Sequence, residues 1–402
     1  MNILFLSQRV PYPPNRGDKI STWKICERFS RDHKLTIVAF AHDQADMDAA
    51  KVLNEEKGIR TIAIPHNEFT KKIRSIPLFL TKRPLTLGVF SSKKLQATVD
   101  ELLPETDFVY AFSSSMGAFL TGKDTPWVMH FAELDSDKWR QYADKHGFPM
   151  GSVYRREWKT LRAFERKIAA ETVTNVFVTP LEKEIFEREI PGNPSLVMRN
   201  GVALNHYTPN PDAAEEAHIV FVGVMDYFPN IDGCVWFANE IFPLIKKAVP
   251  AARFTVVGSK PTAEVLALGE LEGVSVTGFV DDPRDYLEKA VVSVAPLRVA
   301  RGIQNKVLEA LAMGLPAVGT TSATQGVEGI PGTDFIVANE VETFANEVIA
   351  LLKDPARARE LGKRGRKFVE ATYDWEQCLT PLEGMLDQVR SIQLNGSKRS
   401  PV

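Results

Sequence analysis

The sequence predicts an α/β protein built from two doubly wound, Rossmann-like domains with parallel sheets, and three observations support this. The chain has 402 residues, too many for one ordinary hydrophobic core. Short apolar, β-branched segments alternate with helical patterns along its length, as in repeated βαβ units. Most of these segments lack polar alternation, which is typical of strands buried on both faces of a parallel sheet.

The strand segments divide into two sets. In the first half of the chain we expect strands at 2–7, 34–40, 59–65, 107–112, 126–131, 175–179 and 195–200. In the second half we expect them at 218–223, 252–258, 274–279, 291–297, 316–320 and 335–338. Each segment is followed by a helical pattern or by a turn signal, which favours parallel pairing.

The alternation pauses at residues 200–217, which are rich in Pro, Asn and acidic residues. We interpret this segment as a linker between a domain at 1–199 and a domain at 218–372. Residues 373–392 are expected to form a C-terminal helix that packs back on the first domain, and 393–402 a disordered tail.

Composition excludes several classes of function. The net charge is −2, which does not favour nucleic acid as the main partner. Cys26, Cys234 and Cys378 are far apart in the sequence, so we expect neither disulfides nor structural zinc, and a cytoplasmic location. No segment approaches the roughly 18 apolar residues of a membrane-spanning helix, and the short N-terminal apolar run indicates a strand, not a signal peptide.

Ligands of open parallel sheets bind at the carboxyl ends of the strands, so functional residues are expected in the loops there. Gly17 would let the loop after the first strand approach a phosphate or sugar, although, taken alone, it is better explained as a strand–helix turn that needs a glycine. Residues 225–230 follow a later strand in the same way. The chain contains neither GxGxxG nor GxxxxGK[ST], so dinucleotide and P-loop binding are not expected.

The helix within 301–320, RGIQNKVLEALAMGLPAVGT, raises a sharper possibility. If Asn305 caps it, a capping box would need Glu at 308, where Leu308 stands. A surface pair between Lys306 and Glu309 would contribute only about 0.2–0.5 kcal/mol. The alternative is that Glu309 accepts hydrogen bonds from a vicinal diol such as a ribose, at about 1.5–3 kcal/mol each. Lys306, Arg298 and Arg301 would then meet a diphosphate at the helix N-terminus.

Several blocks together resemble the two-domain GT-B glycosyltransferases, in particular the retaining family 4, also called group 1. These blocks are NGV (200–202), FVG (221–223), GFVDD (278–282), and APL with VLEALAMGLPAVGT (295–320). DSDKW (135–139) and MDYFPN (225–230) are similar to sugar transferases of bacterial exopolysaccharide and exosortase (PEP-CTERM) systems.

The resemblance implies that a nucleotide-sugar binds mainly to the second domain and the acceptor to the first. Glu309 matches the residue that holds the ribose hydroxyls, and the backbone at Phe279, Val280 and Asp281 matches the nucleobase contact. The turn at Gly302, Ile303 and Gln304 matches the amides around the donor sugar and phosphates. Gly17 matches a loop glycine beside the diphosphate.

The sequence departs from the family pattern in two places. The family usually has a second glutamate that contacts the transferred sugar, and here Arg301 stands in its place. Many members also carry an Arg and a Lys after the FVG strand, which ends at Gly223, and here those places fall near Val224 and Asn230. Arg298, Arg301 and Lys306 are expected to restore that charge.

For catalysis, the resemblance points to acceptor-side residues. His130 ends a strand near the expected reacting centre, although a hydrogen-bonded buried histidine is the competing interpretation. Asp135 is expected to be an acceptor-side or structural residue. The DSD of residues 135–137 superficially matches a metal-binding DxD motif, as does DMD at 46–48, so we infer no metal and no cofactor beyond the donor.

The resemblance implies transfer of a sugar to a hydroxyl of a saccharide or lipid-linked acceptor, with retention. Residues 67–94 hold seven Lys or Arg and one Glu among apolar side chains, and 153–171 form a second basic amphipathic segment. Both suit peripheral contact with an anionic membrane, although such runs are often solvated faces. A sugar-nucleotide epimerase and a non-catalytic nucleotide-sugar-binding partner are the alternatives.

Overall fold

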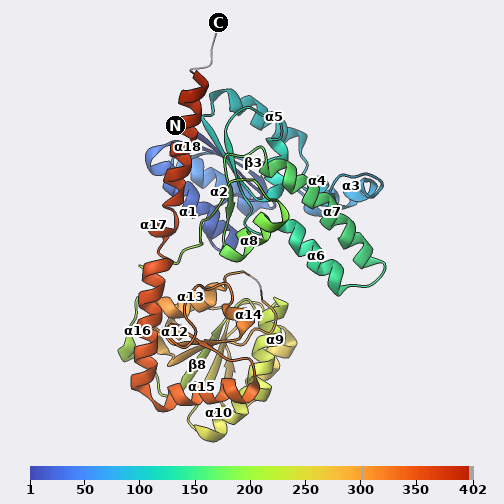
Figure 1. The fold of residues 1–402 in the computed structure, drawn as a ribbon. Helices are drawn as coiled ribbons and strands as arrows, with labels where there is room; N and C mark the ends of the chain where they lie inside the picture. The colour runs from blue at the N-terminus through green and yellow to red at the C-terminus, as the bar shows by residue number, and fades with distance from the viewer. Residues whose placement is uncertain (301, 398–402) are drawn as a thin grey trace. The chain divides into compact units, whose positions relative to one another are not determined.

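The computed structural model describes residues 1–300 and 302–397, and they form two compact units. Unit 1 comprises residues 1–199 together with the chain from Leu379 onward, and unit 2 comprises Asn200–Cys378. Each unit has its own hydrophobic core on a fully parallel sheet enclosed by helices (Figure 1). The predicted α/β fold with two doubly wound sheets is confirmed.

Unit 1 contains a seven-stranded sheet in the order β3-β2-β1-β4-β5-β6-β7. Its strands are β1 (Asn2–Ser7), β2 (Lys34–Ala41), β3 (Arg60–Pro65), β4 (Phe108–Phe112), β5 (Trp127–His130), β6 (Asn175–Phe177) and β7 (Ser195–Val197). Its α-helices are α1 (Gly17–Asp32), α2 (Gln44–Glu55), α3 (Glu68–Ser75), α4 (Leu85–Val89), α5 (Lys93–Leu102), α6 (Asp135–Lys145), α7 (Met150–Ala169), α8 (Pro180–Glu189) and α18 (Pro381–Ser397). Short 3₁₀ turns are η1 (Ile76–Leu80), η2 (Leu103–Glu105) and η3 (Ser114–Phe119).

Unit 2 contains a six-stranded sheet in the order β10-β9-β8-β11-β12-β13. Its strands are β8 (His218–Val222), β9 (Arg253–Val257), β10 (Val274–Val276), β11 (Val292–Ala295), β12 (Ala317–Gly319) and β13 (Ile336–Val337). Its α-helices are α9 (Phe228–Trp236), α10 (Phe242–Ala248), α11 (Ala263–Ala267), α12 (Arg284–Lys289), α13 (Asn305–Ala312), α14 (Thr321–Thr324), α15 (Val341–Lys353), α16 (Pro355–Thr372) and α17 (Trp375–Cys378). It also has a π-helical turn, η5 (Phe237–Ile241), and 3₁₀ turns η4 (Pro211–Ala213) and η6 (Leu268–Glu270).

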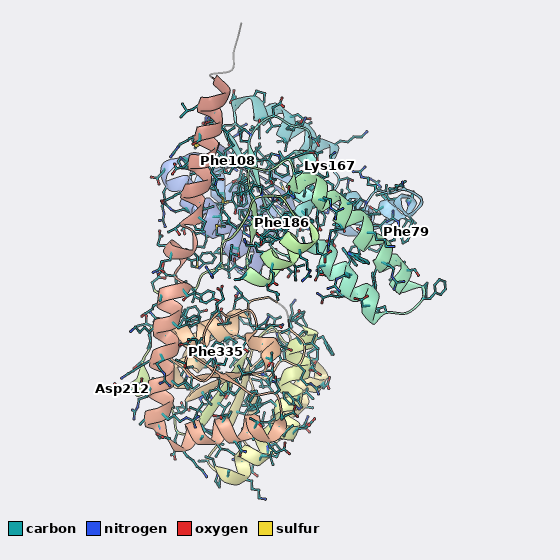
Figure 2. All side chains as sticks on the ribbon, in the orientation of Figure 1. Phe79, Phe108, Lys167, Phe186, Asp212 and Phe335 are labelled. Atoms are coloured by element: carbon teal, nitrogen blue, oxygen red, sulfur yellow. The ribbon has the colours of Figure 1, made fainter. Side chains whose placement is uncertain are left out.

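The strands are strongly apolar because both faces of each sheet are covered. All side chains of β4 and β5 are buried, and those of β1 are buried after Asn2. Figure 2 shows Phe108 and Phe186 inside unit 1 and Phe335 inside unit 2, whereas Phe79 lies at a projecting edge of unit 1. Burial of this kind stabilises a fold by about 25 cal/mol per Å² of apolar surface.

The expected linker at 200–217 belongs to unit 2. Val202 is buried in the core of that unit, and its backbone N–H donates to the Tyr373 carbonyl at 2.7 Å. The side chain of Arg253 is ion-paired with Glu215 at 2.8 Å. The polar and proline-rich composition of the segment is therefore that of a surface loop anchored by a few apolar residues.

The C-terminal region also differs in its boundaries. The expected helix at 373–392 is two helices: α17 in unit 2 and α18 in unit 1. In α18, Glu383 is ion-paired with Arg28 of α1, and Gln393 donates to the Asp107 carbonyl at 3.0 Å. The helix continues to Ser397, so residues 393–397 are not the disordered tail that composition suggested, and 398–402 lie outside the described residues.

Candidate functional site

Each sheet has one point at which the strand order reverses, and ligands of doubly wound sheets bind outside the carboxyl ends of strands at that point. In unit 1 the reversal lies between β1 and β4, and in unit 2 it lies between β8 and β11. Most of the residues singled out by sequence lie in the loops and helices that follow these four strands.

In unit 2 the first such loop begins at Gly223, directly after β8. A Cβ on Gly223 would lie 2.8 Å from Nδ2 of Asn230, so only glycine leaves room for that side chain. Asn230 is buried near the start of α9, and its Nδ2 donates to the Val224 carbonyl at 2.9 Å. The amide oxygen of Asn230 is thereby left free to accept from another group.

That group is Lys306, in the first turn of α13. Its Nζ donates to Oδ1 of Asn230 at 2.5 Å and lies 4.7 Å from the centre of the Phe221 ring. Burial lowers the pKa of Lys306 to about 8, although the charge of Glu309 opposes the shift. Burial removes much of the hydration of the charged amine, so an anion at the switch point would stabilise its charged form.

Glu309 lies one turn further along α13. Burial raises the pKa of its carboxyl group, and a hydrogen bond from the Tyr207 hydroxyl together with the charge of Lys306 acts in the opposite direction. The Lys306–Glu309 pair is therefore not the exposed surface pair that was weighed against a binding role. Tyr207 comes from the segment expected to be a linker, and no motif in the sequence marks it as part of the site.

Arg298 does not supply the free charge that was expected of it. Its guanidinium forms a two-pronged ion pair with the carboxylate of Asp232 in α9, with one N–O distance of 3.0 Å. It also lies over the Trp236 ring, 5.5 Å from the ring centre. Because Asp232 neutralises its charge, the main role of Arg298 is to connect the loop after β11 to helix α9.

The helices that follow the two central strands of unit 2 begin without side-chain caps. The N-cap of α13 is Gln304, not Asn305, and that of α9 is Tyr227, and neither position makes a side-chain cap bond. By contrast, Thr262, Thr320 and Asp354 cap α11, α14 and α16. Uncapped N-terminal amides carry partial positive charge and bind anions.

The turn before α13 contains the next group of expected contacts. Gly302 is exposed and has a φ of 61°, which favours glycine. Ile303 packs partly against the core of unit 2, which fixes the turn. Arg301, the residue that replaces the family's second glutamate, lies outside the described residues.

The loop after β10 carries the expected nucleobase contacts. Phe279 is 75% exposed, Asp281 is exposed, and Val280 packs partly on the core. Neither Asp281 nor Asp282 is the N-cap of α12, which is Pro283. Asp282 instead accepts from the backbone N–H of Arg284 at 2.9 Å and pairs with its guanidinium.

In unit 1, Gly17 is the first residue of α1, the helix after β1, and nothing lies within 4 Å of the position of its missing Cβ. The switch point itself is bridged by Gln8, whose Nε2 donates to Oγ of Ser115 at 2.8 Å. Ser113, at the end of β4, has a φ of 77°, which is strained for a residue other than glycine. The next residue, Ser114, donates to Asp135 of α6.

His130 lies deeper than the expected acceptor-side role requires. Its side chain is only 1% exposed, and its Nδ1 shares a hydrogen bond of 2.8 Å with the Tyr110 hydroxyl. Burial lowers the pKa of the ring to about 3, so the ring is neutral at physiological pH. The geometry is that of the competing interpretation, a hydrogen-bonded buried histidine.

Asp135 is better placed for chemistry. It begins α6, and its Oδ2 accepts from Oγ of Ser114 at 2.6 Å. Burial raises the pKa of its carboxyl group, and the Ser114 bond acts against the shift. Behind it lies Glu165 of α7, whose pKa burial raises to about 8, with Oε1 accepting from the Ser136 N–H at 3.0 Å.

The second aspartate of the DSD stretch has a structural role. Asp137 is buried, and its carboxylate pairs with Arg140 at 2.8 Å and accepts from the amide of Gln141 at 2.6 Å. Within residues 1–300 and 302–397, no group of three or more His, Cys, Asp or Glu side chains could hold a metal ion.

Comparison with known proteins decides the class. Residues 216–354 match the family model of group 1 glycosyl transferases, which covers much of unit 2. An uncharacterised 44.6 kDa protein of the cps region of Klebsiella pneumoniae is 20% identical over 396 residues, covering 94% of this chain and 98% of its own. A GDP-mannose-dependent mannosyltransferase of Corynebacterium glutamicum that acts on a monoacylated phosphatidylinositol monomannoside is 26% identical over 262 residues, covering 58% and 66%.

Among solved structures, Anabaena HepE in complex with UDP superposes with a TM-score of 0.70 at 14% identity, covering 96% of this chain and 100% of HepE. This likeness concerns the fold. The chain is a GT-B glycosyltransferase.

The candidate donor site of this glycosyltransferase also contains a cation that the sequence analysis missed. Lys260, in the loop after β9, has a φ of 56° and is ion-paired with Asp226 at 3.3 Å. The backbone N–H of Met225 donates to the Ser259 carbonyl at 2.8 Å, which joins this loop to the one after β8. Lys260 follows a strand in the sequence, but nothing in its neighbourhood marks it as facing residues 223–230.

No helix in the described part of the glycosyltransferase is long and apolar enough to cross a membrane.

Proposed function

We propose that this glycosyltransferase moves a hexosyl group from a nucleoside-diphosphate sugar to a hydroxyl of a lipid-linked saccharide, with retention at the anomeric carbon. The observation that carries the proposal is the cluster of Lys306, Asn230 and Glu309 beside two uncapped helices, at the switch point of the group 1 domain. A cation, helix N-termini without side-chain caps and a carboxylate in one place match a diphosphate and a ribose.

The donor would be held by four sets of groups. Lys306 and the N-terminus of α13 take the diphosphate, and the carboxylate of Glu309 accepts from the ribose hydroxyls. The exposed backbone of residues 279–281 meets the base, and residues 302–304 meet the sugar. The UDP complex of a protein with the same fold supports a nucleotide ligand. Arg301 is proposed to contact the transferred sugar where the family has an acid.

Transition-state stabilisation would come from charges that the protein supplies. The leaving nucleoside diphosphate gains negative charge as the glycosidic bond breaks, and Lys306 and the N-terminus of α13 would stabilise that charge. We propose that no metal is needed for this step. Excess EDTA should leave the transfer rate unchanged, and a loss that magnesium restores would contradict this part of the proposal.

On the acceptor side, Asp135 is proposed as the residue that orients the attacking hydroxyl. Its raised pKa makes it a better proton acceptor than an ordinary aspartate, and Ser114 fixes one of its oxygens. In a retaining reaction the leaving phosphate can take the proton on the same face, so Asp135 would position the hydroxyl. His130, buried beside Tyr110, would act only by supporting the end of β5.

The setting we propose is polysaccharide synthesis at the inner face of the cytoplasmic membrane. The relative from a cps region supports the first part, and the relative that acts on a phosphatidylinositol mannoside supports a lipid-linked acceptor. Basic and apolar side chains gathered on unit 1 support peripheral attachment.

Two experiments test the proposal. Isothermal titration of the full chain with a panel of nucleotide-sugars should find one that binds, and Lys306→Ala should weaken that binding at least tenfold. An unchanged Kd in the variant would contradict the donor site. Product analysis with and without a lipid-linked acceptor then separates transfer from epimerisation, because an epimerase forms product without acceptor.

A further inference from the structure

Unit 1 presents an apolar ridge to solvent on α3 and η1. Phe69 is 72% exposed, Ile73 52% and Ile76 61%, and Phe79 follows on the same short segment. The helix is amphipathic, but its apolar side faces outward. Its buried residue is Ser75, which is polar. Apolar side chains gathered in this way on a protein surface mark an interaction site.

A second apolar projection lies at the tip of the hairpin formed by α6 and α7. Phe148 is 92% exposed and Met150 45%. In Figure 1, this tip and α3 project from the same side of unit 1. Neither projection contributes to the core of the unit.

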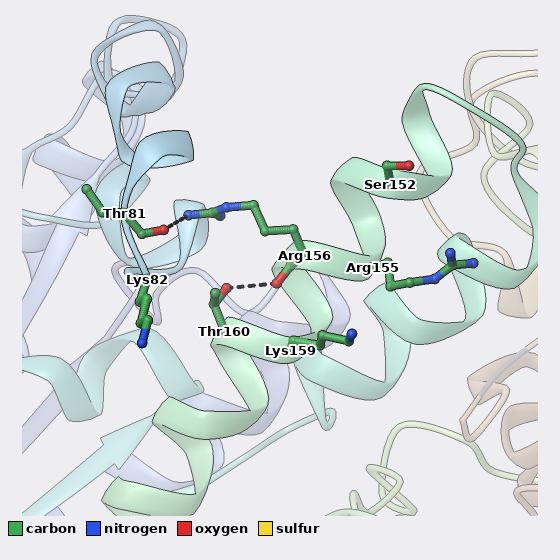
Figure 3. Close-up of a pocket in the computed structure, with 7 residues that line it drawn as sticks. All are labelled: Thr81, Lys82, Ser152, Arg155, Arg156, Lys159 and Thr160. Carbon is green, nitrogen blue, oxygen red and sulfur yellow. Dashed lines mark hydrogen bonds between the residues drawn. The ribbon is translucent and has the colours of Figure 1, made fainter.

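A basic pocket of about 430 Å³ lies beside η1 and the N-terminal half of α7, with Lys82, Arg155 and Lys159 among its lining residues (Figure 3). Its wall is built by Arg156, whose Nη2 donates to the carbonyls of Leu78 and Thr81, both at 2.6 Å. Figure 3 shows the Arg156 side chain reaching from α7 toward Thr81. The pocket is therefore a formed feature, held by a side chain that is not itself available to a ligand.

The lining cations are not neutralised within the described chain. Lys82, Arg155 and Lys159 are exposed, and no ion pair or side-chain hydrogen bond to them occurs among residues 1–300 and 302–397. The nearby acid, Glu157, is buried and accepts from the backbone N–H groups of Leu85 and Thr86, each at 2.8 Å. The carboxylate of Glu157 therefore binds backbone N–H groups inside the unit and does not pair with the three cations.

We propose that this pocket binds the phosphate groups of anionic lipids while the two apolar projections enter the boundary of the same bilayer. The inference deepens the proposed membrane-side function and rests on it for the lipid-linked acceptor. The three unpaired cations can bind phosphate oxygens of the lipid headgroups. In the free protein they are hydrated. The exposed aromatic and aliphatic side chains on both sides fit acyl chains.

The apolar projections decide between a lipid and a free phosphate. A pocket for a soluble phosphate compound would gain nothing from Phe69 or Phe148, which lie outside its lining. A bilayer engages the cations and the projections together, because headgroup phosphates and acyl chains lie within one interface. The surface therefore indicates a membrane lipid as the source of the phosphate.

The test uses the full chain and flotation with phosphatidylcholine vesicles, with and without phosphatidylglycerol. We expect binding to the anionic vesicles only. The triple variant Lys82→Ala/Arg155→Ala/Lys159→Ala should reduce that binding about 100-fold, since each basic residue near the surface contributes about fivefold. Phe69→Ser/Phe148→Ser should reduce it as well, without any change in charge.

A matched control exists on α16 of unit 2. Arg359, Lys363 and Lys367 are one Arg and two Lys, exposed, without an ion pair in the described chain. Replacing these three by Ala removes the same charge and should leave vesicle binding unchanged. Equal losses of vesicle binding in the two triple variants would contradict binding at the pocket and would show that only net charge matters.

Two further measurements separate the outcomes. Titration of the wild-type chain with glycerol 3-phosphate should show no binding comparable to that of vesicles, and tight binding that the pocket variant loses would overturn the lipid source. Nucleotide-sugar binding in the pocket variant should equal that of the wild type. If no nucleotide-sugar binds either protein while vesicle binding behaves as expected, the donor proposal fails and the lipid site stands.

Discussion

Lys306 and Glu309 lie one turn apart on α13, and burial pushes each toward its neutral form. The pKa of the lysine is lowered to about 8, and the pKa of the glutamate is raised. Each partly stabilises the charge of the other, and Asn230 and Tyr207 add one hydrogen bond each. A bound nucleoside diphosphate would supply a full anion to the lysine and hydroxyl donors to the glutamate, so the ligand favours both charged forms.

The first prediction concerns pH. Because the pKa of Lys306 is about 8, the amine is charged below this value and neutral above it. The affinity for the nucleoside diphosphate should therefore fall as pH rises from about 7 to about 9, by up to about tenfold, because the charged fraction of the amine falls by that factor. The second pKa of a phosphate is about 6, so the ligand keeps its charge in this range.

Titration calorimetry of Lys306→Arg provides the control for that profile. Arginine stays charged throughout, so its affinity should be nearly constant over the same range. Lys306→Ala should bind weakly at every pH. A wild-type profile that is flat between these values would show that the amine does not contact the diphosphate.

The second prediction assigns Glu309 to the ribose. The wild type should bind a nucleoside diphosphate more tightly than its 2′-deoxy analogue, by about tenfold or more for one charge-assisted hydrogen bond. Glu309→Gln should weaken binding of the ribonucleotide and remove most of the difference between the two ligands. Equal affinity of the wild type for both ligands would contradict the assignment.

At the scale of elements, the switch point of unit 2 depends on close packing between the end of β8 and the start of α9. Gly223 makes this packing possible, since a Cβ there would lie 2.8 Å from Asn230. Gly223→Ala should displace Asn230, lower the free energy of unfolding of unit 2 by about 1–3 kcal/mol, and weaken nucleotide binding. Chemical denaturation and titration of the same sample measure both.

Gly269→Ala is the matched control in the same unit. Nothing lies within 4 Å of the position of its missing Cβ, and Gly269 belongs to a surface turn, η6. Its stability should change by less than about 0.5 kcal/mol, with nucleotide affinity unchanged. If the two variants behave alike, the contact between Gly223 and Asn230 is not what holds the loop.

Much of the fold was predictable because its signals are local. All thirteen expected strands are present, each with boundaries within a few residues of those expected, since runs of buried apolar residues need no knowledge of the partner strand. The segment at 200–217 was misread because its few anchors, such as Val202, are scattered among loop-forming residues. Helix caps were also misplaced, at Asn305 and at Asp281 or Asp282, because one residue of slippage moves a cap.

The site divides in the same way. Lys306 and Glu309 were identified because they share one short helix, so their proximity follows from spacing. Tyr207 contacts Glu309 and Lys260 contacts Asp226, each from another part of the chain, and sequence gives no sign of such contacts. The charge of Arg298 was misjudged because its partner, Asp232, lies on another helix. The depth of His130 depends on the sheet as a whole.

At the scale of the whole molecule, two separate cores raise the question of whether the units unfold independently. Buried thiols offer a way to measure this. Cys26 in unit 1 and Cys234 in unit 2 are fully buried, and burial raises the pKa of both, to about 12 for Cys234. A neutral, buried thiol reacts only when its surroundings open, so labelling at each cysteine reports opening of its own unit.

The last prediction follows from the proposed position of the donor site in unit 2. A ligand at 100 times its Kd stabilises the folded form by about 2.7 kcal/mol, so labelling of Cys234 should slow about 100-fold. Labelling of Cys26 should keep its rate, because unit 1 gains no such contact in the proposed donor site. Mass spectrometry of the two cysteine peptides after timed exposure to a thiol reagent measures both rates. Lys306→Ala at the same nucleotide concentration should lose the protection of Cys234. Equal slowing at both cysteines would mean that the units open as one body.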